Sequence, residues 1–234
     1  MDKLTEQQKD RMAEAGQAAL NISHGVKNIA QSMRSGAEVM DKALDIGDIE
    51  IAKRTWSILK QNLNRIEKLS LDMLTFSKGQ TPNLHPCDFN KLIESVIQTV
   101  RPQADHRQVS IATELAEQLP QISMDPEQMA DVVMNLLLNA IEAVNAATGR
   151  ITVRTTLDTD TQQVILHISD NGPGIENPDI IFEPFHSTKD NVGAGLGLTI
   201  ARTIIEKHGG TLNAESEPNN GAIFTAHIPV NAHR

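Results

Sequence analysis

Apolar and small residues in the first third of the chain follow one another at alternating steps of three and four. This spacing is the seam of a coiled-coil helix and leaves little freedom for another fold. It is carried first by Met12, Ala15, Ala19, Ile22, Val26, Ile29, Met33, Gly36, Met40 and Ala43. A second seam follows at Ala52, Trp56, Leu59, Leu63, Ile66, Leu69, Met73 and Phe76. The polar stretch DIGD, residues 45–48, separates them, so we predict two long antiparallel helices joined by a tight turn.

One helical hairpin leaves half of each seam uncovered. Two hairpins side by side would form a four-helix bundle, so we expect a homodimer through the hairpin. The pattern ends near Gly79, Pro82 and Pro86, residues that are typical of a linker. We therefore predict a hairpin domain at residues 1–80 and a linker at residues 81–87.

Residues 88–234 change to a mixed pattern of helices and strands. Helices are expected at 88–106, 123–144 and 196–208, and strands at 108–114, 150–157, 164–170, 211–216 and 222–229. Asp125 suits the N-cap of the second helix, with Pro126 at its first position and Gln128 completing a capping box. The predicted fold class is α+β, a helical hairpin followed by a mixed α/β domain.

Charge and composition narrow the classes of function. The net charge of −9 argues against nucleic acid or an anionic membrane surface as the main partner. The sequence shows no run of 18 apolar residues and no signal peptide, so we expect neither a membrane span nor export. A cytoplasmic location follows, by itself or as the cytoplasmic part of a larger, membrane-anchored sensor. The single cysteine, Cys87, fits a reducing compartment and is most simply an incidental thiol.

Two polar motifs in the second domain can contact a nucleotide. Asn135 and Asn139 are four residues apart, so they share a helix face and can offer oxygens to a hard cation or amide protons to phosphate. The alternative is a pair of surface or packing asparagines. Asp170 ends an apolar strand and can accept a hydrogen bond from an exocyclic amine such as that of adenine. Gly172 and Gly174 follow it and permit close backbone approach, although DNGPG is also a good turn sequence.

A glycine-rich segment opens the last expected helix. Gly193, Gly195 and Gly197 leave free N–H groups and the positive end of the helix dipole for phosphates. They do not follow a strand in a βαβ unit, so a dinucleotide-binding Rossmann interpretation is poor. Lys189 precedes them and can reach a terminal phosphate as a point charge, the alternative being simple solvent exposure.

Taken in order along the chain, these motifs resemble the ATP-binding domain of sensor histidine kinases, which belong to the gyrase and mismatch-repair ATPase superfamily. The ending KHGGTLNAESEPNNGAIF, residues 207–224, is similar to that family's as well. The resemblance implies an α/β sandwich in which Asn139 coordinates Mg²⁺ on ATP and Asp170 binds adenine. It also implies a short mobile lid at about residues 182–192, with Lys189 facing phosphate. Asn135 stands where ATP-hydrolysing relatives carry a glutamate that activates water, and an amide is a poor general base.

The hairpin carries a candidate phosphoacceptor, His24. It lies two residues from the seam positions Ile22 and Val26, about 200° round the helix from each, so it is expected to point outward. SHGVKN resembles the family's H-box but has Gly25 in place of the usual acid and Ile29 in place of the usual proline. A missing general base costs about 10²–10⁴-fold, although imidazole is already largely neutral at pH 7.

Two further positions bear on activity. In the family, the residue at Asn28 helps to orient the water that dephosphorylates the partner, which favours the hypothesis of a better phosphatase than kinase. Ala222 replaces a threonine that the family usually places near adenine, so somewhat weaker ATP binding is expected.

We therefore predict ATP-dependent autophosphorylation on His24 and phosphotransfer to an aspartate of a response-regulator receiver domain, with ATP and Mg²⁺ as cofactors. One alternative is a degenerate, nucleotide-binding signalling scaffold, which Gly25 and Ala222 favour. Another is an ATPase or protein-serine kinase of the same superfamily, against which Asn135 and the outward His24 argue.

Overall fold

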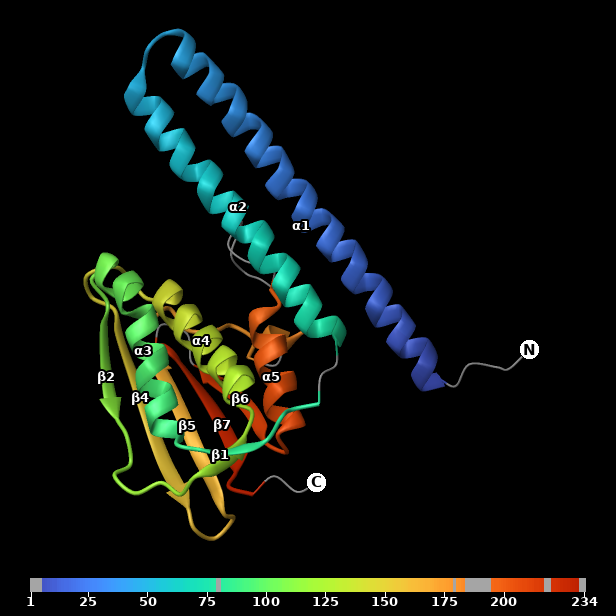
Figure 1. Cartoon of the computed structure of the whole chain (residues 1–234), viewed down its shortest axis with the longest axis vertical. Coiled ribbons are helices and arrows are strands. Elements are labelled where there is room, and N and C mark those ends of the chain that lie inside the picture. The colour runs from blue at the N-terminus through green and yellow to red at the C-terminus, as the bar shows by residue number, and fades with distance from the viewer. Residues whose placement is uncertain (1–5, 79–80, 179, 184–194, 217–219, 232–234) are drawn as a thin grey trace. The chain divides into compact units, whose positions relative to one another are not determined.

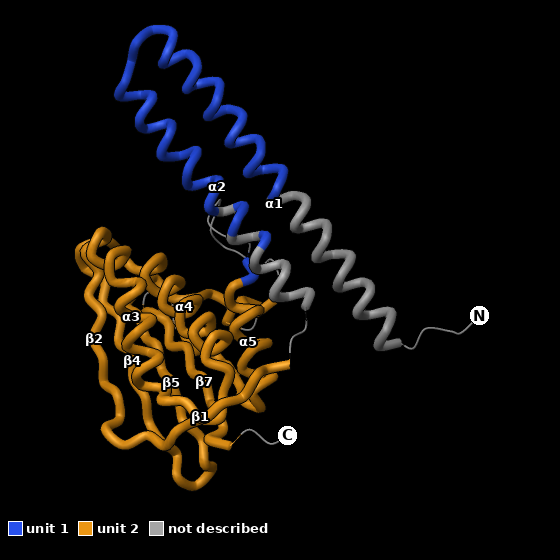
Figure 2. The backbone as a smooth tube through the Cα atoms, viewed as in Figure 1, with its two compact units in different colours: residues 1–78, 184–196 blue, residues 79–183, 197–234 orange. Residues whose placement is uncertain are grey.

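The computed structural model describes residues 6–78, 81–178, 180–183, 195–216 and 220–231, without the side chains of residues 6–25, 65, 68, 69 and 71–78. The described residues form two compact units (Figures 1 and 2). The first contains the two N-terminal helices, and the second contains the strands and the remaining helices. Within the described residues, every helix is either too short or too polar to cross a lipid bilayer.

The first unit is the predicted antiparallel hairpin of α1 (Glu6–Asp45) and α2 (Ile49–Lys78). The turn between them uses Gly47 at a φ of 75°, which a residue without a side chain adopts at little cost. Asp48 then caps α2, because its carboxylate accepts a hydrogen bond from the Ile51 N–H at 3.0 Å. The DIGD stretch therefore ends one helix and starts the next.

The contact line between α1 and α2 is narrow and partly polar. Ala43 and Ala52 are buried, and a side chain on Gly36 would collide with Leu59. The Asn62 side chain, 3% exposed, donates a hydrogen bond to Ser32 Oγ at 3.1 Å across the two helices. The two helices thus cover only part of the apolar seams.

The second unit is built on a five-stranded sheet of order β2-β4-β5-β7-β6. Only the β2–β4 pair is parallel, and the other three pairs are antiparallel. Its strands are β2 (Ser110–Glu114), β4 (Arg150–Asp158), β5 (Gln163–Asp170), β6 (Thr211–Ser216) and β7 (Ala222–Pro229). Helices α3 (Phe89–His106), α4 (Pro126–Ala143) and α5 (Gly197–Lys207) cover one face of this sheet (Figure 1). The result is the expected α/β sandwich.

The core lies between the helices and the sheet. Residues of α3 and α4 that face it are fully buried, and so are alternate residues of the central strands. The largest of these side chains are Phe89, Ile93, Met129, Leu136, Leu137, Ile141, Ile151, Leu166 and Ile168. The opposite face of the sheet carries the polar half of each alternating strand, as its period of two requires.

A second, two-stranded sheet pairs β1 (His85–Cys87) with β3 (Ile122–Met124). Neither strand is expected from the sequence, and β1 occupies residues that were assigned to the linker. A short 3₁₀ helix, η1 (Ile180–Phe182), follows the Asp170 loop.

The α4 N-terminus corrects one further expectation. Asp125 caps α4, since its Oδ1 accepts from the N–H groups of Glu127 and Gln128, both at 3.1 Å. The reciprocal bond of a capping box is not formed by Gln128: the Asp125 N–H donates to Nε2 of the buried His208 at 3.0 Å.

Candidate functional site: a nucleotide pocket and a helical hairpin

Helix α4 carries a polar stripe that reaches the start of α5. Asn135 is half-buried, and its Oδ1 lies 3.1 Å from the position that a Cβ would take on Gly197, the first residue of α5. Any larger residue at Gly197 would have to push this amide aside. The absence of a side chain therefore lets the N-terminus of α5 approach the polar face of α4.

The same stripe ends beside the loop that follows β5. Asn139 lies one turn after Asn135, and Ala143 one turn further on. A Cβ on Gly172 would meet the carbonyl oxygen of Ala143 at 3.3 Å and Asp170 Oδ1 at 2.8 Å. Asn139 therefore lies between the start of α5 and the Asp170 loop, on the helix face that joins them.

Asp170 is half-buried at the end of β5 and is held by its own loop. Its Oδ1 accepts a hydrogen bond from the Gly172 N–H at 2.8 Å. Gly174 has a φ of 81°, a conformation that L side chains rarely adopt. The structure thus places Asn135 against Gly197 and Gly172 against Asp170, and the face of α4 that carries Asn139 joins the two pairs.

Two candidate residues, Lys189 and Gly193, lie outside the described residues. Gly195 is described and has a φ of 66° immediately before α5. Phe182, at the start of the expected lid, is buried and packs edge-to-face against Phe224 with ring centroids 6.5 Å apart, and residues 184–194 of that segment lie outside the described residues. The Phe182 carbonyl oxygen also accepts a hydrogen bond from Thr199 Oγ1 at 2.9 Å.

Asn171 has a role that the sequence analysis did not assign. Its Oδ1 accepts from the Arg150 N–H at 2.7 Å, and its Nδ2 donates to the Thr148 carbonyl oxygen at 3.1 Å. It ties the loop after β5 to the residues that lead into β4. Its two partners lie 21 and 23 residues earlier in the chain, so the DNG turn sequence by itself does not specify them.

An acid precedes the two asparagines on α4. Asp131 lies one turn before Asn135, and partial burial raises its pKa above the ordinary value, with smaller contributions from the negative charges of Glu127 and Asp125. Negative charge is thus disfavoured at this end of the polar stripe.

The residues also fit a single magnesium ion bound together with phosphate. In the part of the chain that the structure describes, no group of three or more His, Cys, Asp or Glu side chains could hold a metal ion. Mg²⁺ usually keeps several waters and takes only one or two protein oxygens beside substrate phosphates. The amide oxygen of Asn139, one turn of α4 after the residue that meets Gly197, suits that kind of site.

The hairpin carries the other two candidates, His24 and Asn28. Both lie within α1, and the described Asn28 side chain is exposed. The side chain of His24 lies outside the described residues. Helical geometry places Asn28 one turn after His24.

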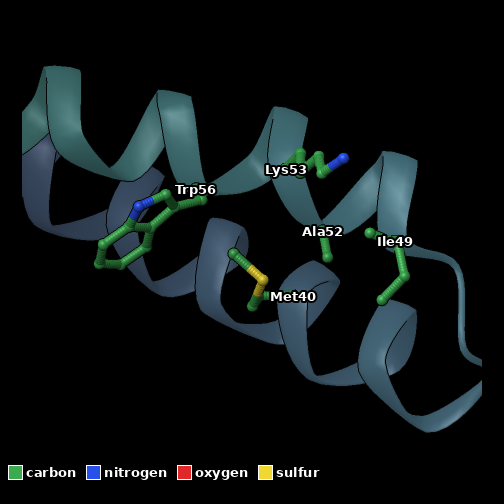
Figure 3. A pocket seen from close by; sticks show the side chains of 5 residues that line it. All are labelled: Met40, Ile49, Ala52, Lys53 and Trp56. Carbon is green, nitrogen blue, oxygen red and sulfur yellow. The ribbon is translucent and has the colours of Figure 1, made fainter.

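One side of the hairpin has an apolar hollow (Figure 3). Met40 of α1 and Ile49, Ala52 and Trp56 of α2 line it, and the aliphatic stem of Lys53 completes the wall. Trp56 is 56% exposed and Ile49 55% exposed, which is unusual for large apolar side chains unless another surface covers them.

Known proteins resemble this chain over both of its units. Residues 124–232 match the family described as histidine kinase-, DNA gyrase B- and HSP90-like ATPase. Sensor histidine kinase ZraS of Escherichia coli K12 is 30% identical over 228 residues, which is 97% of this chain and 48% of that protein. Signal transduction histidine-protein kinase AtoS of the same organism is 30% identical over 226 residues, 96% of this chain and 36% of AtoS. The chain is a homologue of sensor histidine kinases.

The three-dimensional comparison extends across the hairpin. Histidine kinase ThkA, solved in complex with response regulator protein TrrA, aligns with a TM-score of 0.80 and 26% identity. The alignment covers 95% of this chain and 64% of that one. The second unit is therefore a histidine-kinase-type ATPase domain, for which ATP is the nucleotide. The chain spans less than half the length of ZraS or AtoS.

Proposed function

We propose that the chain transfers the γ-phosphoryl group of ATP to His24 and then to an aspartate of a response-regulator receiver domain. The observation that carries this proposal is the α4 stripe of Asn135, Asn139 and Ala143. It runs from the N-terminus of α5 to the Asp170 loop, the two places where a nucleotide needs phosphate and base contacts. Homology to sensor histidine kinases over the hairpin as well as the ATPase domain supports the acceptor.

The described residues of the pocket have roles that their surroundings support. The Asp170 carboxylate accepts the exocyclic amine of adenine, and Gly172 and Gly174 let the base approach the backbone. Gly195 and Gly197 expose N–H groups and the positive end of α5 to the phosphates. Gly193 lies outside the described residues, and its assignment to the phosphates rests on the sequence motif. Lys189 adds a positive charge to the terminal phosphate.

Asn139 would hold Mg²⁺ through its amide oxygen, and the ion supplies charge neutralisation to the phosphates. Asn135 orients the polar face of α4 but cannot remove a proton from water, because an amide has no basic group of useful pKa. ATP therefore persists in the pocket until a side-chain nucleophile meets it. This favours transfer to His24 over hydrolysis.

His24 accepts the phosphoryl group as the bond between the γ-phosphorus and ADP breaks, and the imidazole releases its proton to solvent. Gly25 gives no carboxylate to take that proton, so the rate is lower than that of a chain with an acid at this position. Asn28, exposed one turn further along α1, is placed to orient water for dephosphorylation of the partner.

The exposed large apolar residues of α2 form two separate stripes. Ile49, Trp56 and Leu63 follow one another at seven-residue steps and are 49–56% exposed. Ile51 and Ile58 form a second stripe, about 200° round α2 from the first. The first stripe borders the hollow with Met40, and we assign it to a second copy of the chain, giving a four-helix bundle.

The second stripe is assigned to the receiver domain. Val39 of α1 is 46% exposed and lies eleven residues after Asn28, which places the two almost on one line along the helix. A receiver that covers Val39, Ile51 and Ile58 would therefore also reach Asn28. With these partners, the cytoplasm is the compartment in which the chain works.

The deciding experiment is incubation of the chain with γ-labelled ATP and magnesium. Label that is acid-labile, alkali-stable and lost in His24→Gln establishes phosphohistidine at this position. His85→Gln is the matched control, since His85 is an exposed histidine in the second unit and should keep the label. Label that persists in His24→Gln would overturn the assignment.

A signalling scaffold that binds ATP without kinase activity is the second candidate. It is favoured by Ala222, which is 4% exposed and stands directly opposite Asp170 in the β5–β7 pair without a hydroxyl. ATP binding with no label on any residue would select it. Partner dephosphorylation that Asn28→Ala leaves unchanged would sink the phosphatase role.

A further inference from the structure

Ser216, the last residue of β6, uses one hydroxyl group to join two loops. Its Oγ accepts a hydrogen bond from the Ile175 N–H at 2.8 Å and donates one to the Gly221 carbonyl oxygen at 2.6 Å. Ile175 belongs to the loop that follows Asp170, and Gly221 lies directly before β7. One side chain therefore holds the end of the Asp170 loop against the start of a neighbouring strand.

The sheet register places this hydroxyl in the same row as Asp170. Asp170 stands opposite Ala222 in the β5–β7 pair, and Ala222 stands opposite Ser216 in the β7–β6 pair. Residues directly opposite in antiparallel strands point to the same face, so all three lie on the helix-covered face. Two strand spacings separate Ser216 from Asp170, about 10 Å.

The Asp170 loop is thereby fixed at both ends. At its start, the Gly172 N–H donates to Asp170 Oδ1 at 2.8 Å, and at its end Ser216 holds Ile175. Gly221 has a φ of 77°, and a Cβ there would collide with the Asp170 carbonyl oxygen. The backbone of Gly221 therefore packs directly against that of Asp170. The Ser216 hydroxyl donates its hydrogen bond to the carbonyl oxygen of this same Gly221.

We propose that Ser216 is a positioning residue for nucleotide binding. Its hydroxyl holds residues 171–175 in the conformation that presents the Asp170 carboxylate to the base, and it does so without touching the nucleotide. The inference rests on the proposed ATP-binding function of this pocket. Removing the hydroxyl leaves the Ile175 N–H and the Gly221 carbonyl without this partner, so the loop samples other conformations before ATP binds.

The test compares Ser216→Ala, Ser216→Thr and a control in the whole chain. Affinity for Mg·ATP is measured by titration calorimetry, with melting temperature recorded for each protein. Ser216→Ala should weaken binding about threefold to tenfold, the loss expected for one ordering hydrogen bond, and should leave the phosphorylation rate at saturating ATP little changed. Ser216→Thr keeps the hydroxyl and should restore affinity. Thr211→Ala, exposed on the same strand, should bind as the wild type does.

A measurement on the wild type keeps the proposal testable if Ser216→Ala folds poorly. The Ile175 amide should exchange slowly with solvent before nucleotide is added, and fast exchange would overturn the role of Ser216. Equal ATP affinity of Ser216→Ala and wild type would overturn it too, while leaving the pocket assignment intact. Failure of the wild type to bind Mg·ATP would instead overturn the proposed function and this inference together.

Discussion

The side of the pocket proposed to bind adenine carries the methyl group of Ala222 and no hydroxyl at this position. Ala222 is 4% exposed and pairs with Asp170, while Phe224 packs two residues further along the strand. Serine at position 222 would add a hydroxyl beside the Asp170 carboxylate with little extra volume. A donor at that place should restrain the carboxylate in its binding orientation.

Ala222→Ser is therefore expected to tighten Mg·ATP binding about twofold to tenfold, as one added hydrogen bond allows. Calorimetric titration measures the change, and Ala214→Ser on the helix-covered face of β6 serves as the control for a new hydroxyl on that face. Unchanged or weaker binding in Ala222→Ser would show that the missing hydroxyl does not limit affinity.

Asp131 gives a prediction about pH. Its pKa is raised, chiefly by partial burial and then by Glu127 and Asp125, so the folded chain binds this proton more tightly than the unfolded chain does. The stability contributed by the proton is full below the ordinary Asp pKa of about 3.9 and is lost as the pH rises through the raised value.

Asp131→Asn should consequently stabilise the second unit at pH 7, by at most about 0.5 kcal/mol because the side chain is exposed to screening solvent. Near pH 3 the two proteins should unfold alike. Urea unfolding at both pH values checks this, beside Glu117→Gln, an exposed acid in the loop between β2 and β3. A stabilisation that persists at low pH would contradict the electrostatic cause.

The chemical role of single residues was easier to predict from the sequence than the hydrogen bonds that hold those residues in place. Amide, carboxylate and glycine have properties that a nucleotide needs, which points to Asn135, Asn139, Asp170 and Gly197. The structure places Asn135 against Gly197 and the same face of α4 beside the Asp170 loop. Asn171 and Ser216 were missed. Asn171 bonds to backbone groups of residues 148 and 150, and Ser216 bonds to that of Ile175; these partners are 21 to 41 residues away, and no local pattern specifies them.

At the scale of elements, His208 locks two helices of the nucleotide pocket together. It is 1% exposed, and its Nδ1 lies 2.8 Å from the Ile204 carbonyl oxygen, which can only accept, so Nδ1 carries the proton. Nε2 is then free to accept from the Asp125 N–H at the start of α4. The end of α5 and the start of α4 are joined here, and Gly197 meets Asn135 at the other end of α5.

His208→Ala should lower the unfolding free energy of the second unit by about 1–3 kcal/mol, because the buried Asp125 bond and packing are both lost. His208→Gln keeps an acceptor and should lose less. Chemical denaturation measures both, and exchange of the Asp125 amide reports the bond directly. An Asp125 amide that exchanges equally slowly in wild type and His208→Ala would rule out the role of the ring.

Elements with a clear period were predictable, and short paired ones were not. Strands β6 and β7 begin and end where their alternation predicts, at residues 211–216 and 222–229. Strands β1 and β3 have only three residues each, and each is a strand only through pairing with the other. Gln128 failed as a capping-box partner for a similar reason, since a histidine 83 residues from Asp125 takes its place.

At the scale of the whole molecule, the seam pattern predicted that the hairpin is apolar but not which residues its own two helices cover. Where side chains are described, the contact between α1 and α2 includes the small or polar residues Gly36, Thr55 and Asn62. Larger apolar residues of α2, such as Trp56 and Leu63, remain exposed in the single chain. Sequence periodicity cannot separate the two sets, because both fall on one broad face of each helix.

Trp56 allows the expected dimer to be followed without a label, since it is the only tryptophan of the 234 residues. Dilution should move its fluorescence to longer wavelength as the hollow opens to water, and sedimentation should show the dimer dissociating over the same range. Emission that is independent of concentration while the mass changes from dimer to monomer would place Trp56 outside the interface.

Substituting glutamate into each apolar stripe in turn tests which stripe forms the dimer and which binds the receiver domain. Trp56→Glu brings a charge to the stripe beside the hollow and should yield monomers, because an unpaired buried charge opposes association. Ile58→Glu changes the other stripe, should remain dimeric and label His24, and should transfer phosphoryl to the receiver at least tenfold more slowly, corresponding to about 1.4 kcal/mol or more in the docking step. Sedimentation and transfer from the labelled protein to the receiver are measured for both. If Ile58→Glu dissociated and Trp56→Glu did not, the assignment of the two stripes would have to be exchanged.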